Sequence, residues 1–334
     1  MKKIMNDPEN IVPEMVAGLV QAYPQYLKQL PDTEALVRHD EASMAGKVGV
    51  ISGGGSGHEP AHAGFVGPGM LSAAVAGQVF TSPTPDQIYA AIKAADHGKG
   101  VFMIIKNYSG DVMNFDMAKD LAEMDDIAVK SIVVDDDIAV ENSTFTQGRR
   151  GVAGTIFMHK VIGAAADQGA SLDELATLAQ KVKPNIKTIA VALSGATVPE
   201  VGKPGFILAD DEIEYGVGIH GEPGYRKEKM QPANALASEL LNRLKAEFHY
   251  QAGDHFALLV NGMGATPLME QYVFTHNVMD QLAAAKVNID FTKVGNNLTS
   301  LDMAGVSLTL FKLADSKWLQ ALQYPVDTIA WTQK

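Results

Sequence analysis

Hydrophobic residues along the chain follow two alternating patterns. Short runs rich in β-branched residues, such as Lys47–Ser52, Val101–Lys106 and Ser131–Val134, are typical of buried strands. Between such runs, apolar residues recur every three or four positions, which indicates amphipathic helices. Strands that alternate with helices predict an α/β fold, in which helices flank a mostly parallel or mixed sheet.

The same criteria assign an element to most of the chain. Helices are expected at 11–23, 84–96, 112–124, 154–168, 171–181, 233–248 and 268–285. Further strands are expected at 188–193, 213–219, 256–260, 287–291 and 306–311. Two of the helices begin at residues that match a capping box, namely Thr84 with Gln87 and Ser171 with Glu174.

The chain is long enough for two domains, with 334 residues and 46% hydrophobic content. A break in the helical pattern lies near the middle, at Lys183, Pro184 and Asn185. We therefore expect an N-terminal α/β domain over 1–183 and a C-terminal α/β domain over 184–334.

Composition narrows the possible functions. The formal net charge of −12 argues against binding to nucleic acids or anionic membranes, because both repel an acidic surface. The absence of cysteine excludes disulfides, thiolate nucleophiles and cysteine-ligated metals. No apolar stretch reaches the roughly 20 residues that span a bilayer, and the N-terminus lacks a signal-peptide pattern. We therefore expect a cytoplasmic protein without a membrane segment.

A glycine-rich segment, Ser52–Pro60, follows the first expected strand. Glycine lets backbone N–H groups approach a ligand closely, and this segment contains the titratable His58. It lacks the Gly-Lys-Ser/Thr ending of a phosphate-binding loop, and His58 stands where the third glycine of a dinucleotide-binding motif would lie. The segment predicts either a backbone cradle for ligand oxygens or a sharp turn with an incidental histidine.

Two further polar segments lie where expected strands end, which is where open α/β sheets bind ligands. In the first, Lys106 can donate hydrogen bonds and Asp111 can accept a proton from a hydroxyl; the alternative for Asp111 is the N-cap of the next helix. In the second, Tyr215–Gly224, glycines lie close to His220 on both sides, and a neutral imidazole is a competent nucleophile toward a carbonyl carbon. The alternative for His220 is a residue of a polar turn.

Four other motifs carry weaker signals. His62 follows His58 by four residues, but the sequence around them is not a zinc-protease motif, so we predict no metal site. Asp135–Asp137 is expected to form a solvated turn or to brace the following loop, rather than to bind Mg²⁺. Gln147–Gly151 fits either a phosphate or partner contact or a structural role. Asn261–Thr266 is expected to shape its domain or an interface.

Taken in order, six segments resemble the K subunit of the dihydroxyacetone kinases: GGGSGHEPAH, QVFTSPTPDQI, IIKNYSGDVMNF, VDDDIAVENS, TQGRRGVAGT and YGVGIHGEPG. The similarity extends over nearly the whole chain, from about Asn6 onward. It implies two α/β domains, a homodimer, and dihydroxyacetone as the substrate.

The resemblance also implies a role for each matching residue. His220 matches the histidine that forms a hemiaminal with the substrate carbonyl, and His58 and Asp111 match residues proposed for acid–base chemistry. The implied substrate-binding positions are Gly55, Ser56, Gly57, His58, Lys106 and Asp111. Covalent capture would also select the substrate, because glycerol has nearly the same size and hydrogen-bonding groups but no carbonyl.

By this resemblance the chain acts together with other subunits. It ends at Lys334 without a nucleotide-binding motif, so we expect no cofactor on this chain. ADP/ATP with Mg²⁺ is expected on a partner L subunit, which an M subunit fed by the phosphoenolpyruvate phosphotransferase system rephosphorylates. The alternative is a K-like paralogue that senses dihydroxyacetone as a transcriptional coactivator. The presence of both His58 and Asp111 favours the kinase subunit.

Overall fold

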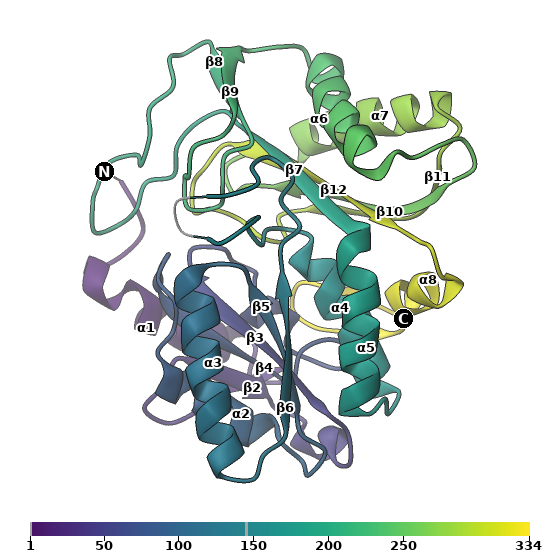
Figure 1. Cartoon of the computed structure of the whole chain (residues 1–334). Helices are drawn as coiled ribbons and strands as arrows, with labels where there is room; N and C mark the ends of the chain where they lie inside the picture. The colour runs from purple at the N-terminus through teal and green to yellow at the C-terminus, as the bar shows by residue number, and fades with distance from the viewer. Residues whose placement is uncertain (1, 144–145) are drawn as a thin grey trace.

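The computed structural model describes residues 2–143 and 146–334, which form two six-stranded sheets flanked by helices (Figure 1). The first sheet has the order β1-β2-β4-β3-β5-β6, from β1 (Leu27–Gln29), β2 (Ala35–Arg38), β3 (Gly49–Ser56), β4 (Ala73–Val79), β5 (Val101–Lys106) and β6 (Val129–Val134). The second has the order β11-β10-β12-β7-β8-β9, from β7 (Ile186–Ala192), β8 (Glu212–Tyr215), β9 (Arg226–Lys229), β10 (His255–Gly262), β11 (Asn288–Gly295) and β12 (Gly305–Lys312). The predicted α/β fold with two mixed sheets is confirmed.

Helices cover the faces of the sheets that carry apolar side chains. They are α1 (Ile11–Ala22), α2 (Pro85–Ala95), α3 (Ser109–Met124), α4 (Thr155–Asp167), α5 (Leu172–Val182), α6 (Ala233–Phe248), α7 (Leu268–Ala284) and α8 (Ser316–Gln323). α2 and α3 share a buried core with one face of the first sheet, and α4 and α5 share another with its opposite face (Figure 1). α6 and α7 pack on the second sheet. Within the described ranges, no helix has the length and apolar character needed to cross a bilayer.

The two sheets differ in strand direction because their connections differ. In the first, β4, β3, β5 and β6 are parallel neighbours, and α2 and α3 supply two of the crossovers that parallel pairing needs. In the second, β10 and β11 are parallel and joined by α7, whereas the other described pairs are antiparallel. The second sheet is therefore mixed, and less parallel than the alternating pattern suggested.

Local hydrogen bonds decide how two helices begin. Ser171 and Glu174 form the predicted capping box at the start of α5. At α2, Thr84 is the N-cap but makes no side-chain capping hydrogen bond. Gln87 instead accepts the backbone N–H of Glu34, which belongs to a distant part of the chain. The capping box predicted for Thr84 and Gln87 is therefore wrong, because Gln87 accepts a hydrogen bond from Glu34 instead.

Two strand boundaries also differ from the prediction. β3 continues through three glycines to Ser56, so most of the glycine-rich segment is strand rather than loop. The strand expected at 213–219 ends at Tyr215. The next residue, Gly216, has a φ of +80°, which a strand does not accommodate.

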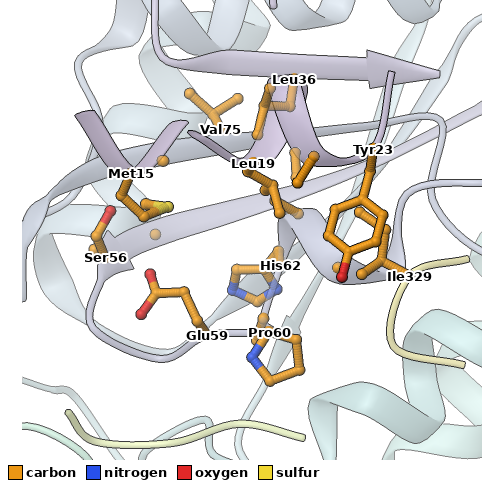
Figure 2. Close-up of a pocket in the computed structure, with 18 residues that line it drawn as sticks. Met15, Leu19, Tyr23, Leu36, Ser56, Glu59, Pro60, His62, Val75 and Ile329 are labelled. Carbon is orange, nitrogen blue, oxygen red and sulfur yellow. The ribbon is translucent and has the colours of Figure 1, made fainter. Parts of the chain in front are cut away.

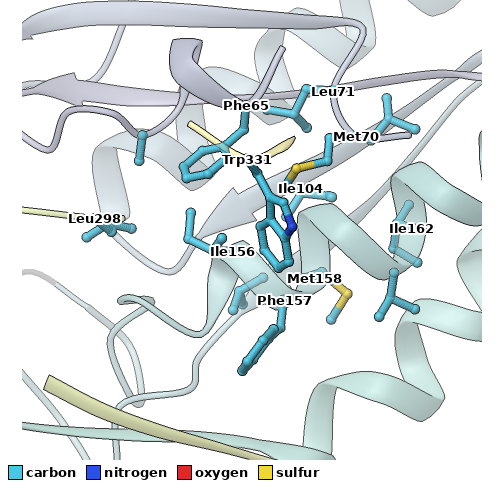
Figure 3. Close-up of a cluster of buried hydrophobic side chains, with 14 of the residues drawn as sticks. Phe65, Met70, Leu71, Ile104, Ile156, Phe157, Met158, Ile162, Leu298 and Trp331 are labelled. Atoms are coloured by element: carbon cyan, nitrogen blue, oxygen red, sulfur yellow. The ribbon is translucent and has the colours of Figure 1, made fainter. Parts of the chain in front are cut away.

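The C-terminal segment packs on the core of the first sheet. Trp331 belongs to the same buried cluster as Phe65 (Figure 3). Lys160 of α4 is also buried, and its Nζ donates hydrogen bonds to the carbonyl oxygens of Ala321 and Tyr324, which ties α8 to α4. Burial lowers the pKa of Lys160 to about 8. The domain ranges 1–183 and 184–334 stay a prediction, since the end of the chain contributes to the first core.

Candidate active site

Two histidines from different sheets meet in the structure. His58 follows the end of β3, and His220 lies in the loop after β8. Their Nε2 atoms are 3.0 Å apart. Phe80 stacks on the ring of His58, and Tyr108 lies edge-on against the ring of His220. The fold thus joins two of the three polar segments that the sequence singled out.

The hydrogen-bond partners of the two rings fix where their protons lie. Nδ1 of His58 is 2.7 Å from the carbonyl oxygen of Thr299, and Nδ1 of His220 is 3.0 Å from Oε1 of Glu222. Both partners are acceptors, so each Nδ1 carries a proton, and the facing Nε2 atoms need one further proton between them. Burial, together with the charges of His220 and Lys106, lowers the pKa of His58 well below its ordinary value. Burial therefore favours the neutral form of His58.

Glu222 contacts His220 at two points, and it was not among the predicted site residues. Its Oε1 accepts from the ring, and its Oε2 accepts the backbone N–H of His220 at 2.9 Å. Burial alone would raise the pKa of this carboxyl, but the hydrogen bond and charge of His220, with the charge of Arg150, lower it to about 2. The sequence signal was a glutamate two residues after a histidine, and spacing alone does not distinguish a buried partner from a solvated acid.

Lys106 and Asp111 lie together at the end of β5. Lys106 is 1% exposed, and its Nζ is 3.7 Å from Oδ2 of Asp111. The same Nζ is 3.2 Å from the carbonyl oxygen of Gly53 and 2.9 Å from Nε2 of His62. Burial lowers the pKa of Lys106, and Asp111 opposes that effect. Since Tyr108 is the N-cap of α3, Asp111 lies in the first helical turn, and the alternative of Asp111 as the N-cap is wrong.

The glycines of β3 allow other groups to approach the backbone closely. Gly54 has a φ of +151°, and a Cβ at this position would lie 2.3 Å from Nζ of Lys106. A Cβ on Gly55 would lie 2.5 Å from the backbone nitrogen of Thr81. The backbone contact leaves no room for a side chain on Gly55, and the positive φ of Gly54 favours glycine at that position.

The next two residues of the segment are already hydrogen-bonded. The hydroxyl of Ser56 is buried and donates to the carbonyl oxygen of Gly77 at 2.7 Å. The backbone N–H of Gly57 donates to the carboxylate of Glu59 at 3.0 Å. A ligand that meets this segment would therefore have to use backbone groups or compete with these bonds.

A cavity of about 480 Å³ lies beside the glycine-rich strand (Figure 2). Its wall is mostly apolar and includes Leu19 of α1, while Glu59 and His62 bring polar groups to it. Neither His58 nor His220 lines this cavity. It is therefore a neighbour of the histidine pair and not the space between the two rings.

Known proteins match this chain in sequence over nearly its whole length, and a solved structure shares its fold. A family model described as the Dak1 domain matches residues 17–330. The chain belongs to the Dak1 family. It is 62% identical over 99% of each chain to the PTS-dependent dihydroxyacetone kinase, dihydroxyacetone-binding subunit DhaK, of Lactococcus lactis. It is 47% identical, over 98% of its length and 100% of the relative, to the DhaKLM operon coactivator DhaQ of the same species. The solved dihydroxyacetone kinase of C. freundii has a TM-score of 0.90 and 33% identity, over 99% of this chain and 60% of that one.

Two weaker motifs of this Dak1 chain have structural partners. His62 is hydrogen-bonded to Lys106, and among the residues that the structure describes no group of three or more His, Cys, Asp or Glu could hold a metal ion. Asn261 accepts the backbone N–H groups of residues 297 and 298 through its side-chain oxygen. It therefore shapes the loop before β12, in line with the structural role that we expected.

The acidic segment after β6 braces the loop that follows it. Asp136 accepts the backbone N–H groups of Val152 and Gly154, both at 2.8 Å. It also accepts from the hydroxyl of Thr188 at 2.5 Å. These bonds confirm the brace as the role of Asp136.

Proposed function

We propose that this chain is the dihydroxyacetone-binding subunit of a multi-subunit dihydroxyacetone kinase, and that it holds its substrate as a hemiaminal on His220. The observation that carries this proposal is the orientation of His220. Glu222 occupies Nδ1, so Nε2 is the ring nitrogen available to attack a carbonyl carbon. The name of the 62% identical relative, a dihydroxyacetone-binding subunit, supports the same substrate.

The capture step needs no proton from outside the pair. The proton between the two rings moves to Nε2 of His58, which leaves a lone pair on Nε2 of His220. That lone pair forms the N–C bond with the carbonyl carbon, the π electrons move to the oxygen, and the oxygen takes the proton from His58. The product is a hydroxyl on an alkylated imidazolium, whose Nδ1–H still faces the carboxylate of Glu222. Charge and protons balance across the step.

Phosphoryl transfer then takes place at a terminal hydroxyl of the captured substrate. We propose that His58 or Asp111 removes the proton of this hydroxyl, and that Lys106 with the backbone of Gly55, Ser56 and Gly57 positions the substrate. The low pKa of the buried His58 keeps its ring neutral, which leaves Nε2 able to accept a hydrogen bond from this hydroxyl. The covalent bond supplies the selection against glycerol, which lacks a carbonyl.

The nucleotide is proposed to arrive on a partner. The chain matches relatives named substrate-binding subunits along their full length, but covers 60% of the C. freundii kinase. By the family resemblance, we propose a cytoplasmic homodimer that works with an L subunit carrying ADP/ATP and Mg²⁺, which an M subunit rephosphorylates. The bound nucleotide would supply the phosphoryl group and Mg²⁺ the charge neutralisation.

Replacing His220 by alanine tests the covalent assignment. Dihydroxyacetone labelled with carbon-13 at the carbonyl is titrated into both proteins, and the labelled carbon is followed by NMR as it changes from trigonal to tetrahedral. We expect a protein-bound tetrahedral signal with the wild type, none with His220→Ala, and a smaller preference of the variant for dihydroxyacetone over glycerol. An adduct that persists in the variant would show that another residue captures the substrate.

The coactivator alternative has a specific observation in its favour, the 47% identity to the coactivator DhaQ. A sensing paralogue could keep the covalent histidine and lack turnover. The presence of His58, whose Nε2 faces that of His220, and of Asp111, which pairs with Lys106, supports the kinase subunit. Phosphorylation of dihydroxyacetone with purified L and M partners decides between them, since binding without product would favour the coactivator.

A further inference from the structure

The two adjacent arginines of Gln147–Gly151 take different environments. Arg149 pairs with Glu247, and both side chains are about one-quarter exposed. Arg150 is 0% exposed and belongs to the largest fully buried side chains of the described residues. A buried guanidinium without compensation is strongly destabilising, so its partners indicate why it is there.

Arg150 lies between two carboxylates. On one side, its Nε donates to Oδ2 of Asp137 at 2.7 Å, and its Nη2 donates to the carbonyl oxygen of Gly216 at 2.7 Å. On the other side, the remaining guanidinium nitrogen, Nη1, has no hydrogen-bond partner within the described residues. Gly218 separates this nitrogen from Glu222 by a short distance only. A Cβ built on Gly218 would lie 2.7 Å from Nη1 of Arg150 and 2.1 Å from Oε2 of Glu222, so the guanidinium and the carboxylate pack against the same glycine.

The charges next to His220 therefore alternate in order. Asp137 is negative, Arg150 positive and Glu222 negative, which leaves one uncompensated negative charge beside the imidazole. A cationic ring on His220 completes the series. The alkylated imidazolium of the proposed hemiaminal fixes such a charge on His220, whereas before capture the proton between the two rings is shared with His58. In a buried site, where charges are poorly screened, this series favours the adduct over the free substrate.

We propose that Arg150 is a positioning residue for covalent capture, which keeps Glu222 ionised and aligned on Nδ1 and the backbone N–H of His220. This inference rests on the proposed function. Arg150 acts through Glu222, since the structure gives it no hydrogen bond to either histidine. A lysine at this position would keep the positive charge but would not replace Arg150 fully. Its single ammonium group lacks the planar guanidinium that spans Asp137 and the Gly216 carbonyl.

The test compares Arg150→Met and Arg150→Lys with Arg149→Met in the full chain, using carbonyl-labelled dihydroxyacetone and carbon-13 NMR. We expect roughly tenfold or more weaker adduct formation for Arg150→Met, a partial recovery for Arg150→Lys, and a change within about threefold for the control. In the double variant with Glu222→Gln, the methionine should add little, because both changes interrupt one interaction. Additive losses, or an Arg150→Met titration equal to the wild type, would overturn the inference.

A second readout does not need the adduct. In substrate-free protein, the NMR resonances of His220 respond when Glu222 takes up a proton at acid pH. Arg150→Met should raise the pH at which Glu222 takes up this proton, because the carboxylate loses the positive charge of the guanidinium. The groups that remain around it are His220, the neutral hydroxyl of Tyr108 and the negative charge of Asp137. An unchanged step refutes the role of Arg150 even if no adduct forms on the wild type, which would refute the proposed function separately. If Arg150→Met does not fold, Arg150→Lys gives the same two readouts.

Discussion

Replacing Glu222 by glutamine measures how much the carboxylate contributes to capture. Its two oxygens accept from two different N–H groups of His220, whereas glutamine has one acceptor oxygen and must turn an N–H₂ group toward the other donor. The pKa of about 2 lies roughly 2.5 below that of an ordinary glutamate, which corresponds to about 3 kcal/mol in favour of the ionised form. Part of this preference comes from Arg150. We therefore expect a loss of about 1.5–3 kcal/mol, or roughly 10- to 150-fold weaker hemiaminal formation.

The assay is the carbon-13 titration of the wild type and Glu222→Gln at one pH. Glu214→Gln is a matched control, because this buried glutamate accepts the backbone N–H of Gly224 in the same loop without contacting the imidazole. The control should remain within about threefold of the wild type, because the hydrogen bond that it changes does not reach the ring of His220. If Glu222→Gln forms the adduct as well as the control does, the carboxylate does not set the reactivity of His220. The assignment of a proton to Nδ1 of His220 is then wrong.

Two further predictions concern turnover and stability. Asp111→Asn and His58→Asn should slow phosphorylation by the reconstituted kinase while binding of dihydroxyacetone is retained at least in part; an equal loss of both would make these residues positioning groups. For Lys160, the pKa of about 8 in the folded chain lies below the value of 10.5 for a free lysine, so between these pH values the unfolded chain binds more protons and the contribution of Lys160 to stability rises with pH. Lys160→Met should remove this rise, as measured by thermal unfolding from about pH 7 to about pH 10.5, and an identical slope in both proteins would contradict the pKa.

Long periodic segments predicted much of the fold because their pattern is local. In the helices and in strands that are buried on both faces, such as β5, the hydrophobic pattern lies in the element's own residues. The strands that sequence reasoning missed have little pattern of their own. β4 is rich in alanine, and β9 (Arg226–Lys229) consists of charged residues. Each is a strand because a neighbour supplies its hydrogen bonds, as β8 does for β9.

The sequence by itself determined which residues could carry the chemistry. His58, Lys106, Asp111 and His220 each stand at a strand end or in the segment that follows one, and their residue types limited the reactions available. Only the tertiary structure decided how they are combined. His58 and His220 are 162 positions apart, and the packing of two sheets brings their Nε2 atoms to 3.0 Å. Which nitrogen of His220 can react depends on the acceptor at the other one, and that acceptor, Glu222, became visible only once the loop had its shape, because hydrogen bonds act over a few ångströms of space and not over distances in sequence.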